Sequence, residues 1–285
     1  RLLERTSQGS WEGTMAPLHT RRQAGTMLLG VAAIGALSSI ASASQGAKSQ
    51  AKPRAAKIEA RPEPISIDLG KTAVIVVDMQ NDFGAEGGMF ERAGIDISGI
   101  RAVVPNVRAA LTAARAASLP IIYLKMAFKP DMSDAGPVTA PNLIKHAPLR
   151  VGAAVTAPNG TRSRILIRDT WNTDIIPELR PQAGDALIYK SRFSGFYRTE
   201  LDDVLRQRGI ETLIVTGCTT SVCVESTVRD AMFRDYRCVV LEDCTAEPIA
   251  ATAPRSNHEA SLLTMQILFA WISDSGKLAR ALSTA

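Results

Sequence analysis

The hydrophobic residues of this chain gather in short, uninterrupted runs. The clearest run covers residues 72–77, consists of apolar and β-branched residues, and is followed directly by Asp78. A continuous run of this kind is typical of a strand buried on both faces, as in a parallel sheet. Similar runs predict further strands, and a shorter one predicts either a strand or a packed loop. The four further strands are expected at 120–124, 186–189, 212–216 and 237–241, and the shorter run lies at 165–167.

Stretches with helical spacing separate these runs. Helices are expected at 103–117, from Thr199 to Gly209, at 222–235 and at 257–271, with a helical turn at 173–179. Alternation of strand and helix predicts one doubly wound α/β domain with a mostly parallel sheet and helices on both faces. A polar stretch with Gly and Pro, residues 129–161, interrupts this pattern, and we expect this long excursion to carry substrate contacts.

The first 45 residues follow a different pattern. Arg21 and Arg22 precede an uncharged stretch, residues 23–45, in which Ala41-Ser42-Ala43 offers a small-x-small cleavage pattern. These features predict a twin-arginine export signal, hence a bacterial protein that is periplasmic or secreted and has no stable membrane association after signal removal. A single membrane anchor is the alternative for this stretch, and a cytoplasmic location follows if the signal is not used.

The sequence also suggests where the folded domain begins. Met15 is a plausible start, which would make residues 1–14 an upstream artefact. Residues 46–61 are polar and rich in Lys, Arg and Ala, which is typical of a flexible linker. The folded domain is therefore expected to cover residues 62–285.

Composition narrows the class of protein. With 46% hydrophobic and 21% charged residues, the chain favours a packed core over disorder. Residues 1–45 hold four Arg and two Glu, a net of +2, which leaves 29 basic and 26 acidic residues, a net of +3, from the total of +5. Because no basic run with interleaved aromatic residues is present, nucleic-acid binding has little support. Three His leave little material for a multi-His metal site.

Three residues whose side chains can transfer protons or act as nucleophiles follow strands of the predicted sheet: Asp78, Lys190 and Cys223. Ligands bind at the carboxyl ends of strands in open parallel sheets. A helix N-terminus and a nearby ammonium are expected to lower the pKa of Cys223 and make it a nucleophile. Asp78 would accept the thiol proton and pass it to a leaving amine, while Lys190 stabilises the thiolate. Considered alone, each residue also has a purely structural interpretation. Cys223 would be a packed thiol, Asp78 a turn residue and Lys190 a solvated lysine.

The remaining Cys and His residues are given structural interpretations. Cys218, Cys238 and Cys244 are expected to be buried packing residues, although a Cys218–Cys244 disulfide stays open in an exported protein. His258 begins a predicted helix and is interpreted as a cap or surface residue. His146 lies in the long excursion, where lining of the substrate pocket is an alternative to packing.

The segments around Asp78, Lys190 and Cys223 resemble the isochorismatase-like cysteine hydrolases. The matching segments are AVIVVDMQNDF (73–83), YKSRFSGFYRTELDDVLRQRGI (189–210), GCTTSVCVESTVRDA (217–231) and LEDC (241–244). The resemblance places Asp78, Lys190 and Cys223 at the family's catalytic positions. It implies a six-stranded parallel sheet, a homo-oligomer, and a cis peptide between Cys218 and Thr219. The backbone N–H groups of Thr219 and Cys223 are then the candidates for an oxyanion hole.

Other segments narrow the resemblance to one branch. Residues 124–134 contain no His, whereas nicotinamidases carry an Asp-x-His…His metal site there, so neither a metal nor another cofactor is expected. ARPEPISID, GGMFERAGID, GPVTAPN and KSRFSGFY resemble the ureidoacrylate amidohydrolase branch. The candidate substrate-binding residues are then Asn142, Trp171, Arg192 and Tyr197, with Arg192 as a partner for a substrate carboxylate.

The sequence thus predicts a metal-independent cysteine hydrolase that cleaves a small carbamoyl or ureido amide through a thioester. One alternative is vinyl-ether hydrolysis of isochorismate, which needs no covalent thioester. Another is a non-catalytic exported protein that retains the fold. The expected partners are a small-molecule amide substrate and further copies of the chain.

Overall fold

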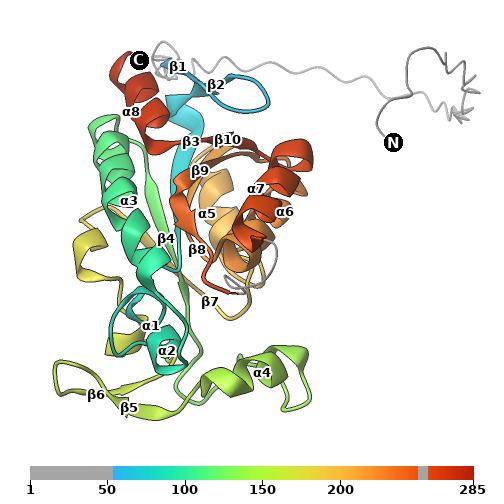
Figure 1. Cartoon of the computed structure of the whole chain (residues 1–285). Coiled ribbons are helices and arrows are strands. Elements are labelled where there is room, and N and C mark those ends of the chain that lie inside the picture. The colour runs from blue at the N-terminus through green and yellow to red at the C-terminus, as the bar shows by residue number, and fades with distance from the viewer. Residues whose placement is uncertain (1–53, 250–255) are drawn as a thin grey trace, which may run out of the picture. The chain divides into compact units, whose positions relative to one another are not determined.

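The apolar runs form a six-stranded, all-parallel sheet with the strand order β10-β9-β8-β3-β4-β7 (Figure 1). This computed structural model describes residues 54–249 and 256–285, so the predicted export signal lies outside the described residues. The six strands are β3 (Thr72–Val77), β4 (Ile121–Met126), β7 (Ala186–Lys190), β8 (Thr212–Cys218), β9 (Arg237–Ala246) and β10 (Trp271–Ser273). The predicted doubly wound α/β fold class is confirmed.

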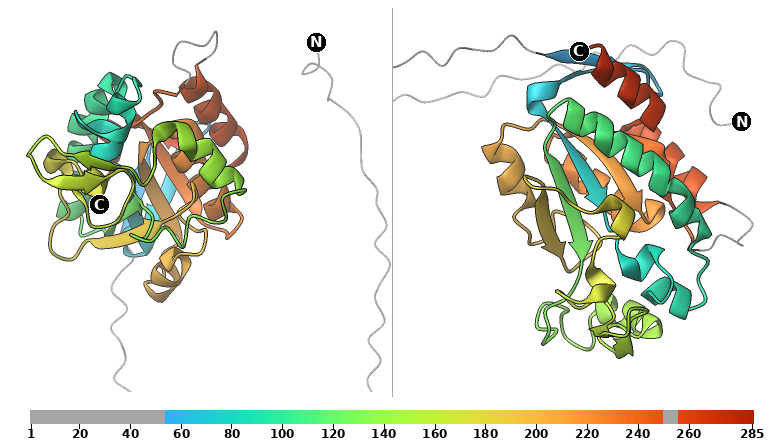
Figure 2. Two further views of the ribbon diagram at one scale, coloured as in Figure 1. Left: turned by 90° about the horizontal axis from the view of Figure 1, so that it is seen from below. Right: turned by 90° about the vertical axis from the view of Figure 1, so that its left-hand side faces the viewer.

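Helices cover both faces of this sheet (Figure 2). On one face lie α3 (Ser98–Ala116) and α8 (Ser275–Ser283), and on the other lie α5 (Leu201–Gln207), α6 (Glu225–Met232) and α7 (Asn257–Leu268). Side chains of β3 alternate between the two hydrophobic clusters, with Val74 and Val76 on the α3 side and Ile75 and Val77 on the α5–α6 side. A strand with two covered faces needs apolar residues at every position, which explains the uninterrupted runs.

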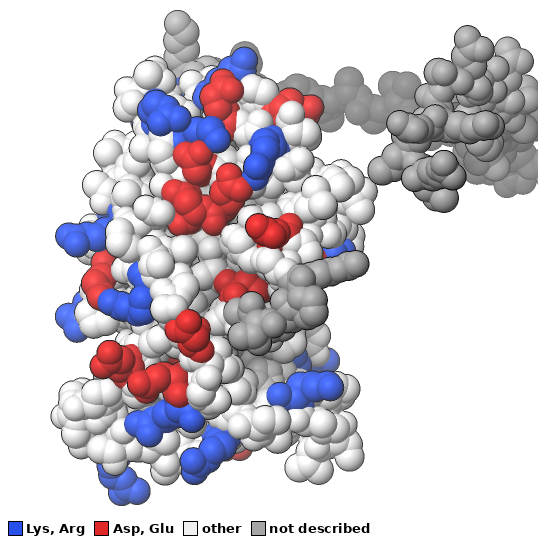
Figure 3. Space-filling model, viewed as in Figure 1, with Lys and Arg blue, Asp and Glu red and all other residues white. Residues whose placement is uncertain are grey.

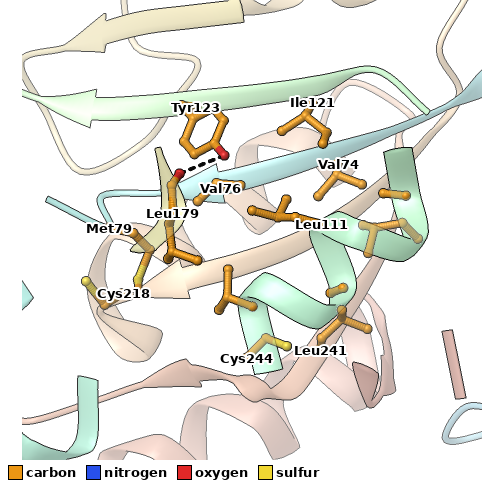
Figure 4. Packing of buried hydrophobic residues seen from close by; sticks show 14 of the residues in the cluster. Val74, Val76, Met79, Leu111, Ile121, Tyr123, Leu179, Cys218, Leu241 and Cys244 are labelled. Atoms are coloured by element: carbon orange, nitrogen blue, oxygen red, sulfur yellow. Dashed lines mark hydrogen bonds between the residues drawn. The ribbon is translucent and has the colours of Figure 1, made fainter. Parts of the chain in front are cut away.

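The cluster beneath α3 shows how tightly the layers are joined (Figure 4). Leu111 of α3 packs against Val74 and Val76 of β3, and Tyr123 of β4 is fully buried beside them. The Tyr123 hydroxyl donates a hydrogen bond of 3.0 Å to the carbonyl oxygen of Leu179, which satisfies its polar atom inside the core.

Short elements gather at the carboxyl end of the sheet (Figure 1). They are α1 (Asn81–Gly84), α2 (Met89–Arg92), α4 (Pro141–His146) and the hairpin of β5 (Ala154–Thr156) and β6 (Arg162–Arg164). The predicted long excursion supplies α4 and most of this hairpin. Residues 165–167 form no strand of the sheet, and Ile167 makes only an isolated bridge to Phe128. The predicted turn at 173–179 becomes two short 3-10 turns, Trp171–Thr173 and Pro177–Leu179.

The carboxyl-terminal prediction needs a correction. A single helix is expected at 257–271, but α7 ends at Leu268, β10 adds an edge strand, and α8 follows. Ile272 of β10 is buried against the α5–α6 side of the sheet, which stabilises a strand too short to stand out in the sequence. Asp274 then caps α8 by accepting a hydrogen bond of 2.7 Å from the Lys277 N–H.

The amino-terminal boundary also needs a correction. Residues 55–61 are not a linker, because β1 (Ala55–Ile58) pairs antiparallel with β2 (Ile65–Asp68) and buries Ala56 and Ile58. Arg61 pairs in both directions with Ile272, at 2.8 and 2.9 Å, and α8 contacts β1. The short alternation of buried and exposed positions is hidden by the Lys, Arg and Ala that surround it. The fold therefore begins before residue 62.

Candidate active site

The first two predicted site residues meet at the carboxyl end of the sheet. Asp78 follows β3 and Lys190 ends β7, with β4 between them. The Lys190 Nζ lies 2.7 Å from Asp78 Oδ2, and both side chains are 0% exposed. Asp78 Oδ1 also accepts a hydrogen bond of 2.9 Å from the Met126 N–H, and Lys190 Nζ donates one of 3.2 Å to the Arg192 carbonyl. These contacts fix both charged groups.

Cys223 reaches this pair from the other side of β3. After β8 the chain makes a π-helical turn, Thr220–Val224, which leads directly into α6. Cys223 is buried, with 6% of the residue exposed, and its thiol lies close enough to Asp78 and Lys190 for their charges to act on its pKa. The structure therefore brings together three residues that lie far apart in the sequence.

Burial of the Cys223 thiol in this cluster disfavours its ionised form. Burial raises the pKa of Cys223 well above its ordinary value, and the charge of Lys190 offsets only part of the effect. The expectation that the helix N-terminus and the ammonium make Cys223 an acidic thiol is therefore wrong. Because a buried thiolate lacks solvation, the thiol has to lose its proton to a neighbouring base when it reacts.

Asp78 has the properties of that base. Burial raises its pKa above the ordinary value, and the positive charge of Lys190 opposes this only in part. For Lys190, burial favours the neutral amine, but the charge of Asp78 outweighs it and raises the lysine pKa. A more basic carboxylate beside a permanent ammonium can accept a proton from the thiol without leaving an uncompensated charge.

The backbone leading into the turn that carries Cys223 has unusual features at Gly217 and at a peptide that follows it. The Cys218–Thr219 peptide is cis, as the resemblance implies. Within residues 54–249 and 256–285, the Thr219 N–H has no hydrogen-bond acceptor. Gly217, which precedes the Cys218–Thr219 peptide, has φ +114°, and a Cβ there would lie 2.0 Å from the Val77 carbonyl oxygen. Glycine is therefore required where β8 passes the end of β3.

Glu247 and His258 hold this turn, although the sequence does not suggest either contact. Glu247 Oε2 accepts hydrogen bonds from the N–H of Ser221, at 2.7 Å, and from its hydroxyl. His258 Nδ1 lies 2.9 Å from Thr220 Oγ1, and burial lowers the pKa of this histidine. His258 is thus partly buried against the turn, and the interpretation as a cap or surface residue is wrong. The local sequence around the turn does not reveal either contact, because Glu247 and His258 both follow β9, the next strand in the chain.

The other three cysteines behave as packing residues. Cys218, Cys238 and Cys244 are buried, and none forms a disulfide. Cys218 Sγ donates to the carbonyl oxygen of Asp78 at 3.3 Å, and Cys244 Sγ contacts Asp243 Oδ1 at 3.5 Å. The Cys218–Cys244 disulfide left open by the sequence is absent because each thiol is directed to a different partner.

The four predicted substrate residues do not form one group. Arg192 and Tyr197 line a cavity of about 270 Å³, with the guanidinium 5.4 Å from the ring centre. Trp171 lines a separate cavity. Asn142 lies in α4, where its side-chain amide donates to the Ala135 carbonyl at 3.1 Å. Neither cavity includes Asp78, Lys190 or Cys223 in its lining.

His146 is buried near the charges of Lys190 and Arg192. Its buried ring contacts Phe128 and Phe193, with ring centres 6.1 and 5.5 Å away. Nδ1 donates to the Asn142 carbonyl at 2.6 Å, so Nε2 is the acceptor of the neutral ring. Burial lowers the pKa of His146, and the nearby charges of Lys190 and Arg192 lower it further. This position is consistent with lining the substrate pocket.

Two kinds of feature are absent from the described part of the chain. Residues 54–249 and 256–285 contain no group of three or more His, Cys, Asp or Glu arranged to bind a metal ion. Within the same ranges, no helix combines the length and the apolar character needed to span a bilayer.

An all-parallel α/β sheet with a thiol, a carboxylate and an ammonium buried together at its carboxyl end has the architecture of a cysteine hydrolase. Residues 72–277 match the family model described as the isochorismatase domain. The chain therefore belongs to the isochorismatase family.

Individual relatives agree with this assignment. The ureidoacrylate amidohydrolase RutB of Yersinia enterocolitica is 41% identical over 217 residues, which cover 76% of this chain and 91% of the relative. A cysteine hydrolase from Pseudomonas syringae pv. phaseolicola is similar in structure, with a TM-score of 0.63 and 31% identity over 76% of this chain and 95% of that one. An N-carbamoylsarcosine amidase from Thermoplasma acidophilum gives a TM-score of 0.53 and 26% identity over 72% and 96% of the two chains.

Proposed function

We propose that this hydrolase cleaves a carbon–nitrogen bond of a small carbamoyl or ureido amide through a thioester on Cys223. The observation that carries the proposal is the buried ion pair of Asp78 and Lys190 at the carboxyl end of the sheet, with the buried Cys223 beside it. The relatives named ureidoacrylate amidohydrolase and N-carbamoylsarcosine amidase support the substrate class.

In the first half of the reaction, Cys223 Sγ attacks the amide carbon while Asp78 takes the thiol proton. Negative charge develops on the amide oxygen, which accepts hydrogen bonds from the N–H groups of Thr219 and Cys223. The carbon–nitrogen bond then breaks, and Asp78 returns its proton to the leaving nitrogen. The products of this half are a free amine or ammonia and an acyl or carbamoyl thioester.

In the second half, Asp78 takes a proton from a water molecule that attacks the thioester carbon. The carbon–sulfur bond breaks and the thiol of Cys223 recovers its proton, which completes the cycle. Lys190 keeps its charge throughout and holds Asp78 through the 2.7 Å ion pair. No step requires a metal ion, since proton transfer and charge stabilisation come from side chains and backbone N–H groups.

The charge distribution favours an anionic substrate. The cavity beside Arg192 is also lined by Lys129, Arg168 and Arg198, with Asp134 as its one carboxylate. On the face shown in Figure 3, basic side chains gather at the lower end, over α4, β5 and β6. We therefore propose that Arg192 pairs with a substrate carboxylate and that Tyr197 supports the guanidinium through its ring.

Ammonia or amine release from ureidoacrylate, biuret, N-carbamoyl amino acids and nicotinamide tests this function. We expect the wild-type protein to hydrolyse a ureido or carbamoyl compound, Cys223→Ala to be inactive, and Cys238→Ala, a packing thiol on the same side of the sheet, to stay active. Intact-mass spectrometry during turnover should show an acyl or carbamoyl adduct on wild-type protein and on Cys238→Ala, and none on Cys223→Ala. Wild-type rates in Cys223→Ala would refute the mechanism, and hydrolysis of none of the four would refute the substrate class.

Export and oligomerisation stay predictions. For export, we expect a mature N-terminus near Ser44 in the periplasmic fraction of the host, because Ala41-Ser42-Ala43 precedes that point. Full-length protein confined to the cytosol would argue against it. For oligomerisation, light scattering of the purified protein should give a mass of at least two chains.

A further inference from the structure

A second cavity lies on the face of the sheet opposite to Cys223. Along β4, Tyr123 points into the cluster beneath α3, whereas Leu124 points into the cluster that includes Cys223. Because side chains alternate along a strand, Lys125 lies on the α3 side. It lines a cavity of about 440 Å³ that does not include the catalytic cluster. The cavity is therefore separate from the proposed reaction.

Lys125 is a buried cation with little compensation. Its residue is 6% exposed, and it forms no salt bridge with the described residues. Its one hydrogen bond there is a long one, 3.5 Å from Nζ to the Tyr189 hydroxyl, whose ring centre lies 5.0 Å away. That hydroxyl donates in turn to Asp169 Oδ1 at 2.7 Å, so it is an acceptor for Lys125. At least one N–H donor of the ammonium remains for a ligand.

The free energy of this arrangement favours an added negative charge. Burial lowers the pKa of Lys125, and Asp174 and Asp169 offset only part of that effect. Burying an ammonium without a hydrogen-bonded counter-ion is strongly unfavourable, and an anion in the cavity would remove that penalty. Anion binding and protonation of Lys125 would thus support each other.

The other walls of the cavity define what kind of anion fits. Arg180 supplies a second cation and Asp174 a single carboxylate, so with Lys125 the formal charge of the lining is +1. This charge suits a monoanion and disfavours a dianion. Trp171 and Leu187 supply apolar surface, which suits a ligand with a flat carbon body.

We propose that this cavity binds a small planar monocarboxylate, with its carboxylate on Lys125 and its carbon body against Trp171. The site does not depend on the proposed hydrolysis, because Asp78, Lys190 and Cys223 are not part of the cavity's lining. It gives Trp171 a role as a ligand-binding residue away from the catalytic cluster.

Benzoate is a suitable probe, with benzamide as its neutral analogue and inorganic phosphate as a dianion. Calorimetric titration of the full chain should show benzoate binding at least about tenfold more tightly than either, as expected for one charge-assisted contact. Lys125→Met keeps the length of the side chain and removes its charge, so benzoate affinity should fall about tenfold or more. Lys71→Met, at an exposed lysine, should leave it unchanged.

Three further measurements fix the location. Arg180→Gln, an exposed change that does not disturb the core, should weaken benzoate several-fold, and Trp171→Phe should abolish the fluorescence response to benzoate. Cys223→Ala should bind benzoate as the wild type does, so loss of hydrolysis and loss of this site are distinguishable. Any one of three results would overturn the proposal. They are equal affinity for benzoate and benzamide, unchanged benzoate binding in Lys125→Met, and competition by benzoate at the catalytic site that persists in Lys125→Met.

Discussion

Asp78 is the residue on which most contacts of the catalytic cluster converge. It adopts φ +52°, a left-handed conformation that Asp tolerates better than most residues, and this turns its carboxylate back over the sheet. One oxygen is held by the Met126 N–H and the other by Lys190. Each partner of the ion pair depends on the other, since neither reaches solvent.

Lys190→Met should strongly destabilise the protein, because it leaves Asp78 buried without its counter-ion. We expect a loss of about 3–5 kcal/mol in the free energy of unfolding, measured by urea denaturation. Adding Asp78→Asn, which removes the orphaned charge, should restore a large part of that loss. Lys71→Met, at an exposed ion pair, should change stability by less than about 1 kcal/mol. A double variant no more stable than Lys190→Met would contradict this account.

His146 should make stability depend on mildly acidic pH. Its pKa in the folded protein is lowered, mainly by burial, so the unfolded chain binds its proton more readily. Free energy of unfolding is therefore expected to fall as pH decreases through the ordinary histidine pKa of about 6.5. Between pH 7.0 and 5.5, His146→Asn should lose less stability than the wild type. The lowered pKa of His258 acts in the same direction in both proteins, so equal losses would exclude a contribution from His146.

At the scale of elements, the junction between β8 and the turn of Cys223 is the most constrained part of the fold. Gly217 lies against the end of β3, the next peptide is cis, and Glu247 and His258 hold the turn that follows. The nucleophile is thus positioned by a strand, a turn and two distant side chains.

Gly217→Ala should test this junction. A Cβ at this position combines an unfavourable φ with a clash against Val77, so we expect a loss of about 2–5 kcal/mol. Gly209→Ala is the matched control, since Gly209 has φ +65° but no atom within 4 Å of the added Cβ, and should lose about 1–2 kcal/mol. Both values come from urea denaturation. Similar losses in the two variants would show that the close approach to β3 is unimportant.

The predictable elements are the strands whose residues form uninterrupted apolar runs. Strands β3, β4, β7, β8 and β9 follow from apolar runs, and strand-end polar residues then suggested Asp78, Lys190 and Cys223. The burial that raises the pKa of Cys223, and the contacts of Glu247 and His258, depend on packing between distant segments. Strands β1 and β10 were missed for another reason, because each is short and stabilised mainly by its neighbours.

At the scale of the whole molecule, the catalytic cluster exists only when the sheet is complete. Asp78, Lys190 and Cys223 follow three different strands, β3, β7 and β8, and β4 has to lie between the first two. The amino-terminal hairpin contributes no residue to this cluster and still belongs to the folded unit, since β1 buries Ala56 and Ile58.

A chain that begins at Pro62 should therefore be less stable than one that begins at Arg54. Removing β1 exposes the surface that Ala56 and Ile58 cover, and we expect a loss of about 2–4 kcal/mol in the free energy of unfolding. Thermal and urea denaturation of the two purified chains measure the difference. Equal stability of the two chains would indicate that residues 55–61 are a linker after all.

The pairing of Arg61 with Ile272, together with the contact between β1 and α8, has a practical consequence. Arg54 and the carboxyl terminus lie near one another at the end of the sheet opposite to Asp78 (Figure 1). A chain beginning at Arg54 could be anchored to a resin or a sensor chip through either end, with its substrate side facing the liquid. The two orientations of attachment should then give the same turnover.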